Sequence, residues 1–548
     1  MINNKEMRSA GMVIESITVP LDASEQHVLA KAASRLKRIG LRPALFDLSL
    51  FKRSVDARDR DQIRFVYSVL ATPEESVPAL DVAKLAREKI KLLKNQEILP
   101  VFGLEPMAAP PLVVGMGPAG LFAALMLARY GYRPIIIDRG DSIADRTRSV
   151  MHFYDTKQLD TDSNIQFGAG GAGTFSDGKL MTRIHDPKCS FVLETFVRHG
   201  APSDILLVSK PHIGTDLLRG VVDSMLKEIQ NLGGQVIYRC RLDGFEQNAD
   251  GSVTARTTKG KLLCSSIVLA IGHSARDTYQ MLLKKQMELV AKPISVGVRI
   301  EHLAADIDKA MYGSFAGHPA LGHAEYALSD TKTGRGVYTF CMCPGGEVMA
   351  AASEQERLVV NGMSYRARDG RNSNAAVVVS LGCQDFEPVN GSLAEGAIAL
   401  QRRIEHEAFL AGGGNFAAPI QTVGDFLSEK VSSEPCSVQP TYMNGFCHVT
   451  DLSAIFPQVV GKTLRYGLEA FDKKICGFAA PDAVLTGAET RTSAPIRMTR
   501  NEEGTAIGFS YVYPCGEGAG YAGGITSAAV DGVKTALAVM KRYAPYHD

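Results

Sequence analysis

Three glycines in the stretch LVVGMGPAG have the spacing that binds a pyrophosphate. Gly115, Gly117 and Gly120 form G-x-G-x-x-G directly after an apolar run and at the start of a helical one. The first glycine permits a tight turn, the second lets the backbone approach the phosphates, and the third lets the helix pack closely on the strand. The helix N-terminus adds free N–H groups. Asp138 follows 23 residues after Gly115, in the range where a carboxylate binds a ribose hydroxyl pair. The motif alone fits either NAD(H) or FAD.

Three later segments favour FAD. The first is NIQFGAGGAGTFSDGKL, residues 164 to 180, which contains mainly small residues after Phe167. Its backbone can therefore lie flat against a large planar ring, a feature for which a simple NAD dehydrogenase has no evident need. The second segment, VLAIGHSA, ends a predicted set of helix, strand, hairpin and strand that would complete the adenine side of the site. Gly272 marks where the chain passes the cofactor.

The third segment, YPCGEGAGYAGGITSA, would meet the flavin end of the cofactor. Glu517 is a candidate acceptor for the ribityl hydroxyls. Gly523, Gly524 and Ile525 open the last predicted helix, whose positive end would face the negative charge of a reduced flavin. Together these segments predict that the pyrophosphate belongs to FAD.

The combination of GMGPAG with its acid, AIG and GEGAG resembles the FAD-binding fold of glutathione-reductase-like flavoproteins, in the branch with one nucleotide-binding and one substrate domain. More narrowly, KRSVDAR, GAGGAGTFSDGKL, CMCPGG, ARDGRNSN and PCGEGAGYAGGI resemble a bacterial family described only as FAD-dependent dehydrogenases or oxidoreductases. The resemblance spans nearly the whole chain. It implies pyrophosphate at the first glycine loop, ribose at Asp138 and flavin contacts from Gly170 to Lys179. Related flavoproteins commonly have Asp in the last motif and Glu at the ribose, whereas this chain has Glu517 and Asp138.

The predicted cofactor-binding set covers all of these segments. It consists of Gly115, Gly117, Pro118, Ala119, Gly120, Asp138, Arg139, Gly170, Gly171, Thr174, Ser176, Gly178, Lys179, Leu242, Gly272, Gly516, Glu517, Gly523, Gly524 and Ile525. No metal site is predicted, because the ten cysteines include no CxxC pair.

FAD carries the electrons, so the chain must supply mainly orientation and charge. Outside the segments described above, no further G-x-G-x-x-G follows a strand, and no C-x4-C pair is present, so neither a separate NAD(P)H domain nor a disulfide reductase is expected. The sequence predicts an FAD-dependent oxidoreductase for a small organic substrate, for which an anion is a candidate. NAD(P)H is a candidate transient electron donor. The catalytic residues stay unassigned; candidates on the substrate side are Lys179, Arg183, Arg368 and Arg371.

Further residues that could line the substrate site are His185, Cys341, Cys343, Asn361, Ser364 and Arg366. The arginines of YRARDGRNSN fit either a grip on a carboxylate or phosphate or a solvated basic loop. Buried structural thiols are favoured for Cys341 and Cys343, which should point the same way on a strand. Cys515 is expected to pack, and His273 to be an ordinary residue at a strand end.

The elements that position these residues predict an α/β protein. Residues 1–105 form a small α/β domain with a strand at MVIESITVPL, a helix carrying Leu29, Ala32, Ala33 and Leu36 on one face, and a strand at QIRFVYSV. Residues 106–280 and 501–548 form a Rossmann-like, three-layer FAD-binding domain, whose second long helix carries an apolar stripe that includes Leu217. Residues 281–500 form an inserted α+β substrate domain.

Bulk properties exclude several classes of protein. Lysine and arginine number 60 against 59 acidic residues, so no net field gathers nucleic acid or anionic membrane. The start of the chain has no signal-peptide core and no apolar run is long enough to span a membrane, so a cytoplasmic protein with reduced thiols is expected. The expected partner is a small molecule. The oligomeric state is not predicted.

Two alternatives stay open at this level. One is an RNA-modifying flavoprotein that uses its N-terminal domain on RNA. The loop FKRSVDARDRDQIR carries several arginines, but the interspersed aspartates favour a solvated hairpin of mixed charge. The other is a non-enzymatic flavin-bound sensor or scaffold.

Overall fold

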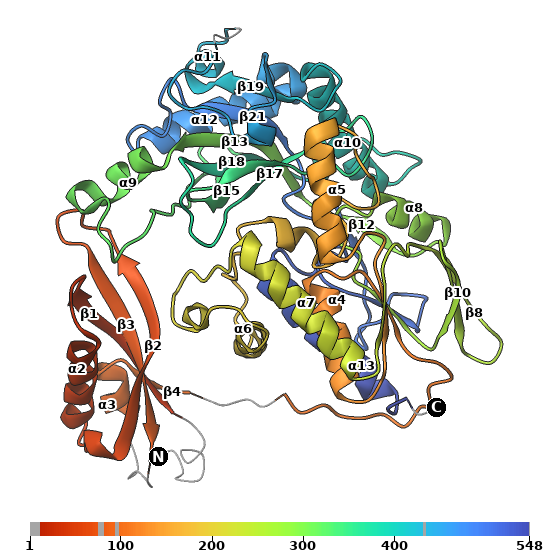
Figure 1. Cartoon of the computed structure of the whole chain (residues 1–548), viewed down its shortest axis with the longest axis horizontal. Coiled ribbons are helices and arrows are strands. Elements are labelled where there is room, and N and C mark those ends of the chain that lie inside the picture. The colour runs from red at the N-terminus through yellow and green to blue at the C-terminus, as the bar shows by residue number, and fades with distance from the viewer. Residues whose placement is uncertain (1–10, 75–81, 94–97, 431–433, 547–548) are drawn as a thin grey trace. The chain divides into compact units, whose positions relative to one another are not determined.

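The computed structural model describes residues 11–74, 82–93, 98–430 and 434–546 (Figure 1). It contains two compact units. The first consists of Met1–Leu99 with two later segments, Pro202–Pro211 and Asp308–Ala324. The second consists of Pro100–Ala201, His212–Ile307 and Glu325–Asp548. The sequence did not indicate that the two short later segments belong with the N-terminal residues.

The first unit is built on a four-stranded antiparallel sheet with the order β2-β3-β1-β4. Its elements run β-α-β-β-α-β, the split βαβ pattern. Helix α2 begins after Ser24, whose hydroxyl caps the N–H of His27, and it buries Val28, Ala32 and Leu36. The elements are β1 (Met12–Pro20), α2 (Glu25–Arg38), β2 (Phe46–Asp56), β3 (Arg64–Pro73), α3 (Val82–Arg87) and β4 (Ile90–Leu92).

Two sequence predictions for this unit can be compared with the structure. The buried stripe of α2 is rotated from the predicted one, because Val28 lies at its centre while Leu29 and Ala33 are only half-buried. The loop between β2 and β3 is the predicted hairpin of mixed charge, in which Arg58 binds Asp56 at 2.8 and 2.6 Å. Phe65 and Tyr67 of β3 are buried.

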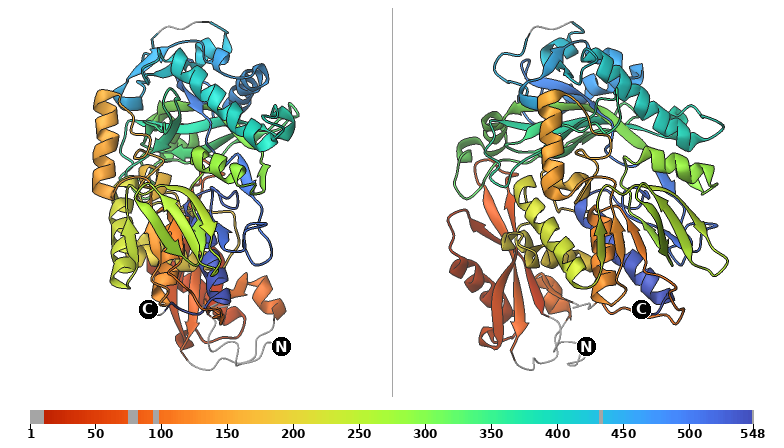
Figure 2. Two further views of the ribbon diagram at one scale, coloured as in Figure 1. Left: turned by 90° about the vertical axis from the view of Figure 1, so that its right-hand side faces the viewer. Right: turned by 45° about the vertical axis from the view of Figure 1, so that its right-hand side comes forward.

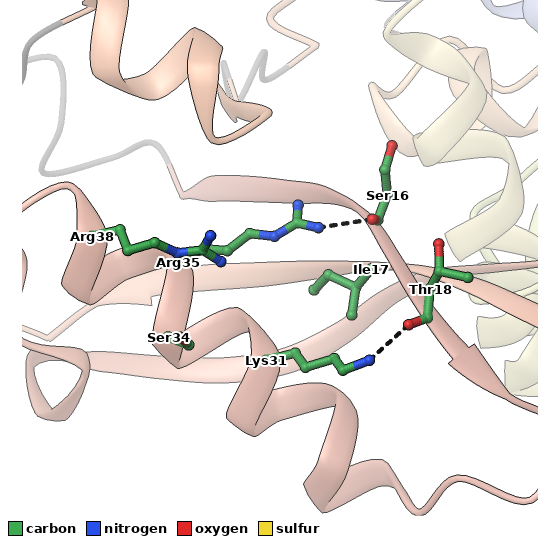
Figure 3. A pocket seen from close by; sticks show the side chains of 7 residues that line it. All are labelled: Ser16, Ile17, Thr18, Lys31, Ser34, Arg35 and Arg38. Carbon is green, nitrogen blue, oxygen red and sulfur yellow. Dashed lines mark hydrogen bonds between the residues drawn. The ribbon is translucent and has the colours of Figure 1, made fainter.

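A basic cavity between α2 and β1 has a structural explanation. Figure 3 shows Lys31, Arg35 and Arg38 extending from α2. Strand β1 has a bulge between Ile14 and Ile17, and Arg35 donates to the exposed carbonyl of Ser16 at 2.8 Å. Lys31 donates to a carbonyl of the same strand at 2.9 Å, and Arg38 lies 3.5 Å from Glu88. Lys31 and Arg35 therefore hold the bulged strand against the helix, and Arg38 binds the residues between α3 and β4.

The second unit contains a parallel sheet with the order β23-β11-β5-β6-β7. Helices α4, α7 and α13 pack side by side (Figure 1), and a three-stranded antiparallel sheet, which faces the viewer in the left view of Figure 2, forms a further layer. The elements are β5 (Leu112–Val114), α4 (Pro118–Arg129), β6 (Ile135–Ile137), α5 (Ile143–Thr156), α6 (Lys188–Arg198), α7 (Thr215–Asn231), β7 (Gln235–Ile237), β8 (Leu242–Gln247), β9 (Val253–Thr257), β10 (Gly260–Cys264), β11 (Ile267–Leu269), β23 (Val512–Pro514) and α13 (Ile525–Arg542). This arrangement confirms the predicted α/β fold class.

Between β11 and β23 the chain builds a seven-stranded mixed sheet with the order β14-β15-β18-β13-β21-β19-β20. The chain enters this region through β12 and leaves it through β22, and these two strands pair with each other. The elements are α8 (Arg276–Lys284), β12 (Leu289–Ala291), β13 (Ile294–Leu303), α9 (Ala304–Tyr312), β14 (Ser329–Asp330), β15 (Val337–Cys343), β16 (Glu347–Ala350), β17 (Val360–Met363), β18 (Asn372–Leu381), α10 (Leu393–Ala411), β19 (Ala418–Thr422), α11 (Val423–Leu427), β20 (Cys447–Val449), α12 (Gln458–Asp472), β21 (Val484–Glu489) and β22 (Ile496–Met498).

Helix α5 packs against the glycine-rich segment and against the residues around β16 and β17. Its residue Val150 packs with Phe175 of the glycine-rich segment and with Met349, Val359 and Met363 around β16 and β17. Phe153 of the same helix makes an edge contact with Phe416, with ring centroids 5.1 Å apart. Phe175 therefore fixes the glycine-rich segment against α5 and against the residues around β16 and β17.

Three sequence predictions are wrong in detail. The run QVIYRCRLDGF is not one strand, because Arg239 has a left-handed φ of 48° and separates β7 from β8, which belong to different sheets. Strand β11 ends at Leu269 rather than at Gly272. Leu217 is exposed, because the buried stripe of α7 is formed by Leu218 and the residues that follow it at helical spacing.

Among the described residues, no helix is long and apolar enough to cross a membrane.

Candidate cofactor site

The first glycine loop has the shape that its sequence predicts. Strand β5 ends at Val114, Gly115 has a φ of 104°, and α4 starts at Pro118 with Gly117 at its N-cap. A Cβ at Gly115 would collide with the carbonyl of Ala270, and one at Gly120 with the carbonyl of Gly115. The close packing of this turn therefore requires glycine, and it leaves the first N–H groups of α4 at the carboxyl edge of the sheet.

Asp138 lies at the end of the neighbouring strand β6 and is buried. Its carboxylate accepts the N–H of Met116 at 2.8 Å and the N–H of Gly140 at 2.9 Å. Asp138 thus holds the glycine loop in place, and each oxygen retains a lone pair for a ribose hydroxyl. The hollow beside it is lined by Val114, Gly115, Asp138, Arg139, Phe167, Cys240, Arg241, Leu242, Ile271, Ala275 and Thr278.

This hollow brings together four residues of the predicted set, Gly115, Asp138, Arg139 and Leu242, which come from three segments of the chain. Arg139 follows Asp138, and its guanidinium lies 4.4 Å from the ring centre of Phe167. Leu242 contributes from the start of β8, and Ile271 from the turn after β11. The sequence predicted Leu242 and Arg139 for the cofactor, and in the structure both line the same hollow as Asp138.

The glycine-rich segment is held by a residue that the sequence did not single out. Arg146 of α5 is fully buried, and its guanidinium donates to the carbonyls of Asn164, Ile165, Ala169 and Gly171 at 2.7 to 2.9 Å. Burial lowers the pKa of Arg146 to about 9, with the nearby charge of Asp138 acting in the opposite direction. With the carbonyl of Gly168 at 3.3 Å, five main-chain acceptors thus replace the carboxylate that a buried arginine usually takes.

The two glycine segments touch each other. A Cβ at Gly171 would lie 2.9 Å from the Cα of Gly117, and one at Gly140 would lie 2.6 Å from the Cα of Gly168. The hydroxyl of Thr174 is buried and donates to carbonyls of its own segment, including that of Gly171 at 2.9 Å. Thr174 therefore supports the segment from within rather than presenting its hydroxyl to a ligand.

The third glycine segment joins the same edge. Gly516 donates its N–H to the carboxylate of Asp531 at 2.6 Å. The same carboxylate accepts hydrogen bonds from the two terminal nitrogens of Arg500. A Cβ at Gly518 would lie 2.5 Å from the backbone of Gly272. Thr526, in the first turn of α13, donates to the carbonyl of Leu180 at 2.6 Å.

Glu517 is the ionisable group of this segment. It accepts the N–H of Gly524, and burial raises the pKa of Glu517 to about 7, against the opposing charge of Lys292. A Cβ at Gly272, Gly523 or Gly524 would meet no atom within 4 Å, so these glycines face open space.

The four segments therefore fit FAD. The first glycine loop supplies N–H groups for the pyrophosphate, Asp138 and its hollow suit the adenosine, and Glu517 and the start of α13 suit the ribityl chain and the ring. The glycine-rich segment packs closely on the first glycine loop, where a Cβ at Gly171 would lie 2.9 Å from Gly117. The open faces at Gly272, Gly523 and Gly524 leave room for a large ligand.

A cluster of charges lies next to the glycine-rich segment. Asp177 is buried and binds Arg368 at 3.1 and 2.6 Å, and Ser364 donates to the same carboxylate. Arg368 also binds Glu325 at 2.6 Å. Lys179 lies 3.8 Å from Asp177, beyond hydrogen-bond distance. The positive charge of Arg368 is therefore balanced by protein carboxylates, whereas Lys179 has only a long contact.

The remaining substrate-side candidates are scattered. Arg371 is exposed and donates to the carbonyl of Ser437 at 3.0 Å, while Arg183 and His185 are exposed. Two other candidates are engaged in hydrogen bonds with protein groups. Arg366 donates to the carbonyl of His212, and Asn361 accepts a hydrogen bond from Arg299 at 3.1 Å.

Buried thiols were predicted for Cys341 and Cys343. The prediction is confirmed for Cys343 and wrong for Cys341. Cys343 is buried and its thiol donates to the carbonyl of Cys341 at 3.3 Å. Cys341 is exposed with a left-handed φ of 44°, because β15 is irregular between Phe340 and Cys343 and the alternation of faces is broken there. Cys515 is buried, as expected.

A buried ion cluster borders the site and was also missed. Glu405 of α10 is fully buried and binds Arg276 at 2.7 Å through each oxygen, together with Arg491 at 2.9 and 3.1 Å. The two arginines hold the pKa of Glu405 far below its usual range, against the effect of burial. These residues are far apart in sequence, so no local motif reveals them.

Comparisons with known proteins support FAD as the cofactor. Residues 109–158 match a family model described as FAD binding domain, residues 293–492 match "FAD-dependent protein, C-terminal domain-like", and residues 13–72 match a domain of unknown function. An uncharacterised protein of Clostridium beijerinckii is 46% identical over 500 residues, 90% of this chain and 92% of that protein.

Solved structures give weaker likenesses. CtdE in complex with FAD is 9% identical with a TM-score of 0.30, covering 79% of this chain and 84% of CtdE. The amino acid oxidase NikD is 11% identical with a TM-score of 0.33, covering 79% and 94%. The predicted kinship with the glutathione-reductase-like branch stays a prediction, whereas dependence on FAD is confirmed. The chain therefore belongs to one family with the Clostridium beijerinckii protein, a family of FAD-dependent proteins, and its cofactor is FAD.

Proposed function

We propose that the protein is an FAD-dependent oxidoreductase for a small anionic organic molecule, with Lys179 binding the negative charge. The observation that carries the proposal is the state of the Lys179 ammonium. Its nearest carboxylate, Asp177, lies 3.8 Å away and is already engaged by Arg368 and Ser364. Lys179 has three N–H donors, and among the described residues no hydrogen bond to its ammonium is found.

The position of Lys179 supports a role at the flavin end of the site. Its neighbour Leu180 receives the hydrogen bond of Thr526 in the first turn of α13. The N-terminus of α13 carries a partial positive charge, so it and Lys179 attract an anion together. Burial raises the pKa of the Cys343 thiol while the charge of Lys179 lowers it, which places Lys179 within electrostatic reach of β15 in the seven-stranded sheet.

When bound, FAD accepts or donates a hydride. In this proposal Lys179 holds the anionic group of the substrate and orients it, and Asp177 limits the positions that Lys179 can take. Arg368 neutralises Asp177, so the ammonium keeps its attraction for the ligand. The fixed main chain of the glycine-rich segment excludes water from one side.

Binding of an anion can be tested with simple carboxylates. Benzoate should change the absorption spectrum of the FAD-loaded protein, and the neutral analogue benzamide should not. Lys179→Met should weaken the benzoate effect about tenfold, the loss of one charged hydrogen bond, and Lys179→Arg should retain it in part. Equal responses to benzoate and benzamide, or an unchanged response in Lys179→Met, would remove the basis of the proposal.

The reaction type is tested by anaerobic reduction. Loss of the oxidised flavin bands after addition of NADH or NADPH would support a nicotinamide-linked reductase, while dithionite shows that the flavin can be reduced at all. A flavin that only dithionite reduces is expected if a metabolite is the donor, and a screen of small carboxylic acids then follows. If no soluble donor reduces it, a sensor or scaffold explains the site better.

A further inference from the structure

A chain of hydrogen bonds beside the cofactor site starts at a main-chain carbonyl. The carbonyl of Ala351 accepts a hydrogen bond from the side-chain nitrogen of Gln166 at 3.3 Å. The side-chain oxygen of Gln166 lies 3.2 Å from the hydroxyl of Ser274. The same hydroxyl lies 2.9 Å from Nδ1 of His273. Because a carbonyl can only accept, it fixes the orientation of the Gln166 amide. That orientation determines which atom donates in each of the next two hydrogen bonds.

These directions determine where the imidazole carries its proton. The oxygen of Gln166 cannot donate, so the Ser274 hydroxyl must donate its one proton to it. The hydroxyl oxygen is then an acceptor toward the ring, and Nδ1 of His273 must carry the hydrogen. In a neutral imidazole the other nitrogen, Nε2, is left with a free lone pair.

The surroundings keep this ring neutral. Burial is the main cause that lowers the pKa of His273, to about 3, and the positive charges of Arg491 and Arg276 act in the same direction. Glu405 acts in the opposite direction, but it is bound to both arginines. His273 can therefore accept a hydrogen bond at Nε2, but it does not take up a proton at neutral pH.

The ring stands at the cofactor edge of the parallel sheet. His273 follows Gly272, which has open space on its Cβ side and whose backbone packs on Gly518 of the flavin turn. Tyr279 fixes both sides of this contact by donating to the carbonyls of Gly272 and Gly518 at 3.2 and 2.9 Å. His273 is partly exposed although Ser274 and the two residues that follow it are buried. His273 therefore lies directly beside the open Cβ side of Gly272.

We propose that His273 is a positioning residue for FAD, held as the Nδ1–H tautomer so that Nε2 accepts a hydrogen bond from a hydroxyl or N–H group of the cofactor. This assigns a role to a residue that the sequence suggested was an ordinary strand end. The acceptor is fixed before the cofactor arrives, so little ordering remains to be done on binding. The proposal rests on FAD binding alone and does not depend on the substrate.

The tautomer can be measured directly on the wild-type protein. In protein labelled with ¹⁵N-histidine, the His273 signal is identified by its loss in His273→Gln. We expect the pattern of an Nδ1–H imidazole with and without FAD, unchanged between pH 6 and pH 8. An Nε2–H pattern, or a ring that becomes doubly protonated in this range, would overturn the proposal. This readout does not depend on a variant that folds poorly.

Affinity for FAD gives the second test. In apoprotein titrated with FAD, His273→Phe should bind about tenfold more weakly, because a donor of the cofactor loses its acceptor. His273→Gln keeps an acceptor near the position of Nε2 and should bind within about threefold of wild type. His152→Phe, at an exposed position on α5, serves as the matched control. If His273→Phe has the melting temperature and FAD affinity of wild type, the proposal is wrong.

Discussion

FAD binding should strengthen with pH because of Glu517. Burial raises the pKa of this carboxyl to about 7 in the chain without cofactor, so about half of the molecules are ionised at pH 7. Only the ionised form offers both oxygens to the hydroxyls of a ribityl chain. Binding therefore favours ionisation, lowers the pKa of Glu517 and releases a proton, so affinity must rise with pH.

The size of the effect follows from the pKa. From pH 8 to pH 6 the ionised fraction falls from about nine-tenths to about one-tenth, so the dissociation constant of FAD should rise about tenfold, or about 1.4 kcal/mol. Glu517→Gln should bind FAD with the same affinity at both pH values, and more weakly than the wild type does at pH 6. Protonation of Glu517 also removes the partner charge of Lys292, which lies close enough to influence it.

The assay is titration of apoprotein with FAD at pH 6, 7 and 8, followed by quenching of FAD fluorescence. Glu503→Gln, at an exposed position of the same part of the chain, is the control and should keep the wild-type pH dependence. An equal affinity of the wild type at pH 6 and pH 8 would refute the reasoning. The same holds if Glu517→Gln keeps the wild-type pH dependence.

Three further outcomes concern buried charges. Arg146→Met should lower the free energy of unfolding by about 3 kcal/mol, measured by urea denaturation, because several buried carbonyls lose their donor. Glu405→Gln should cost about 3–5 kcal/mol in the same assay, since two buried arginines lose their anion; an effect below about 1 kcal/mol would contradict this. Arg368→Met should weaken benzoate binding several-fold, because the freed Asp177 would then take up Lys179; tighter binding would show that this account of the charge cluster is wrong.

The sequence is most informative where a single backbone feature demands one residue type. At Gly115 and Gly120 a side chain would collide with a neighbouring carbonyl, so the spacing of the glycines predicts the loop and a pyrophosphate as its ligand. The position of Asp138, the predicted ribose ligand, follows because a β-α-β unit has a nearly fixed length.

The sequence is silent where distant segments meet. Arg146 is bound by main-chain carbonyls, which carry no side-chain signature, and its role could not be predicted. Asp177 and Arg368 are 191 residues apart, and only folding brings them together. Periodicity also fails at local irregularities, as at Arg239 and Cys341, where a left-handed residue breaks a strand.

The central claim is that the four converging segments bind FAD. The most direct test is the visible absorption spectrum of the purified protein before and after incubation with FAD and removal of the excess. We expect the bands of a bound flavin at about one FAD per chain. A protein that shows no flavin bands after this treatment would contradict the account.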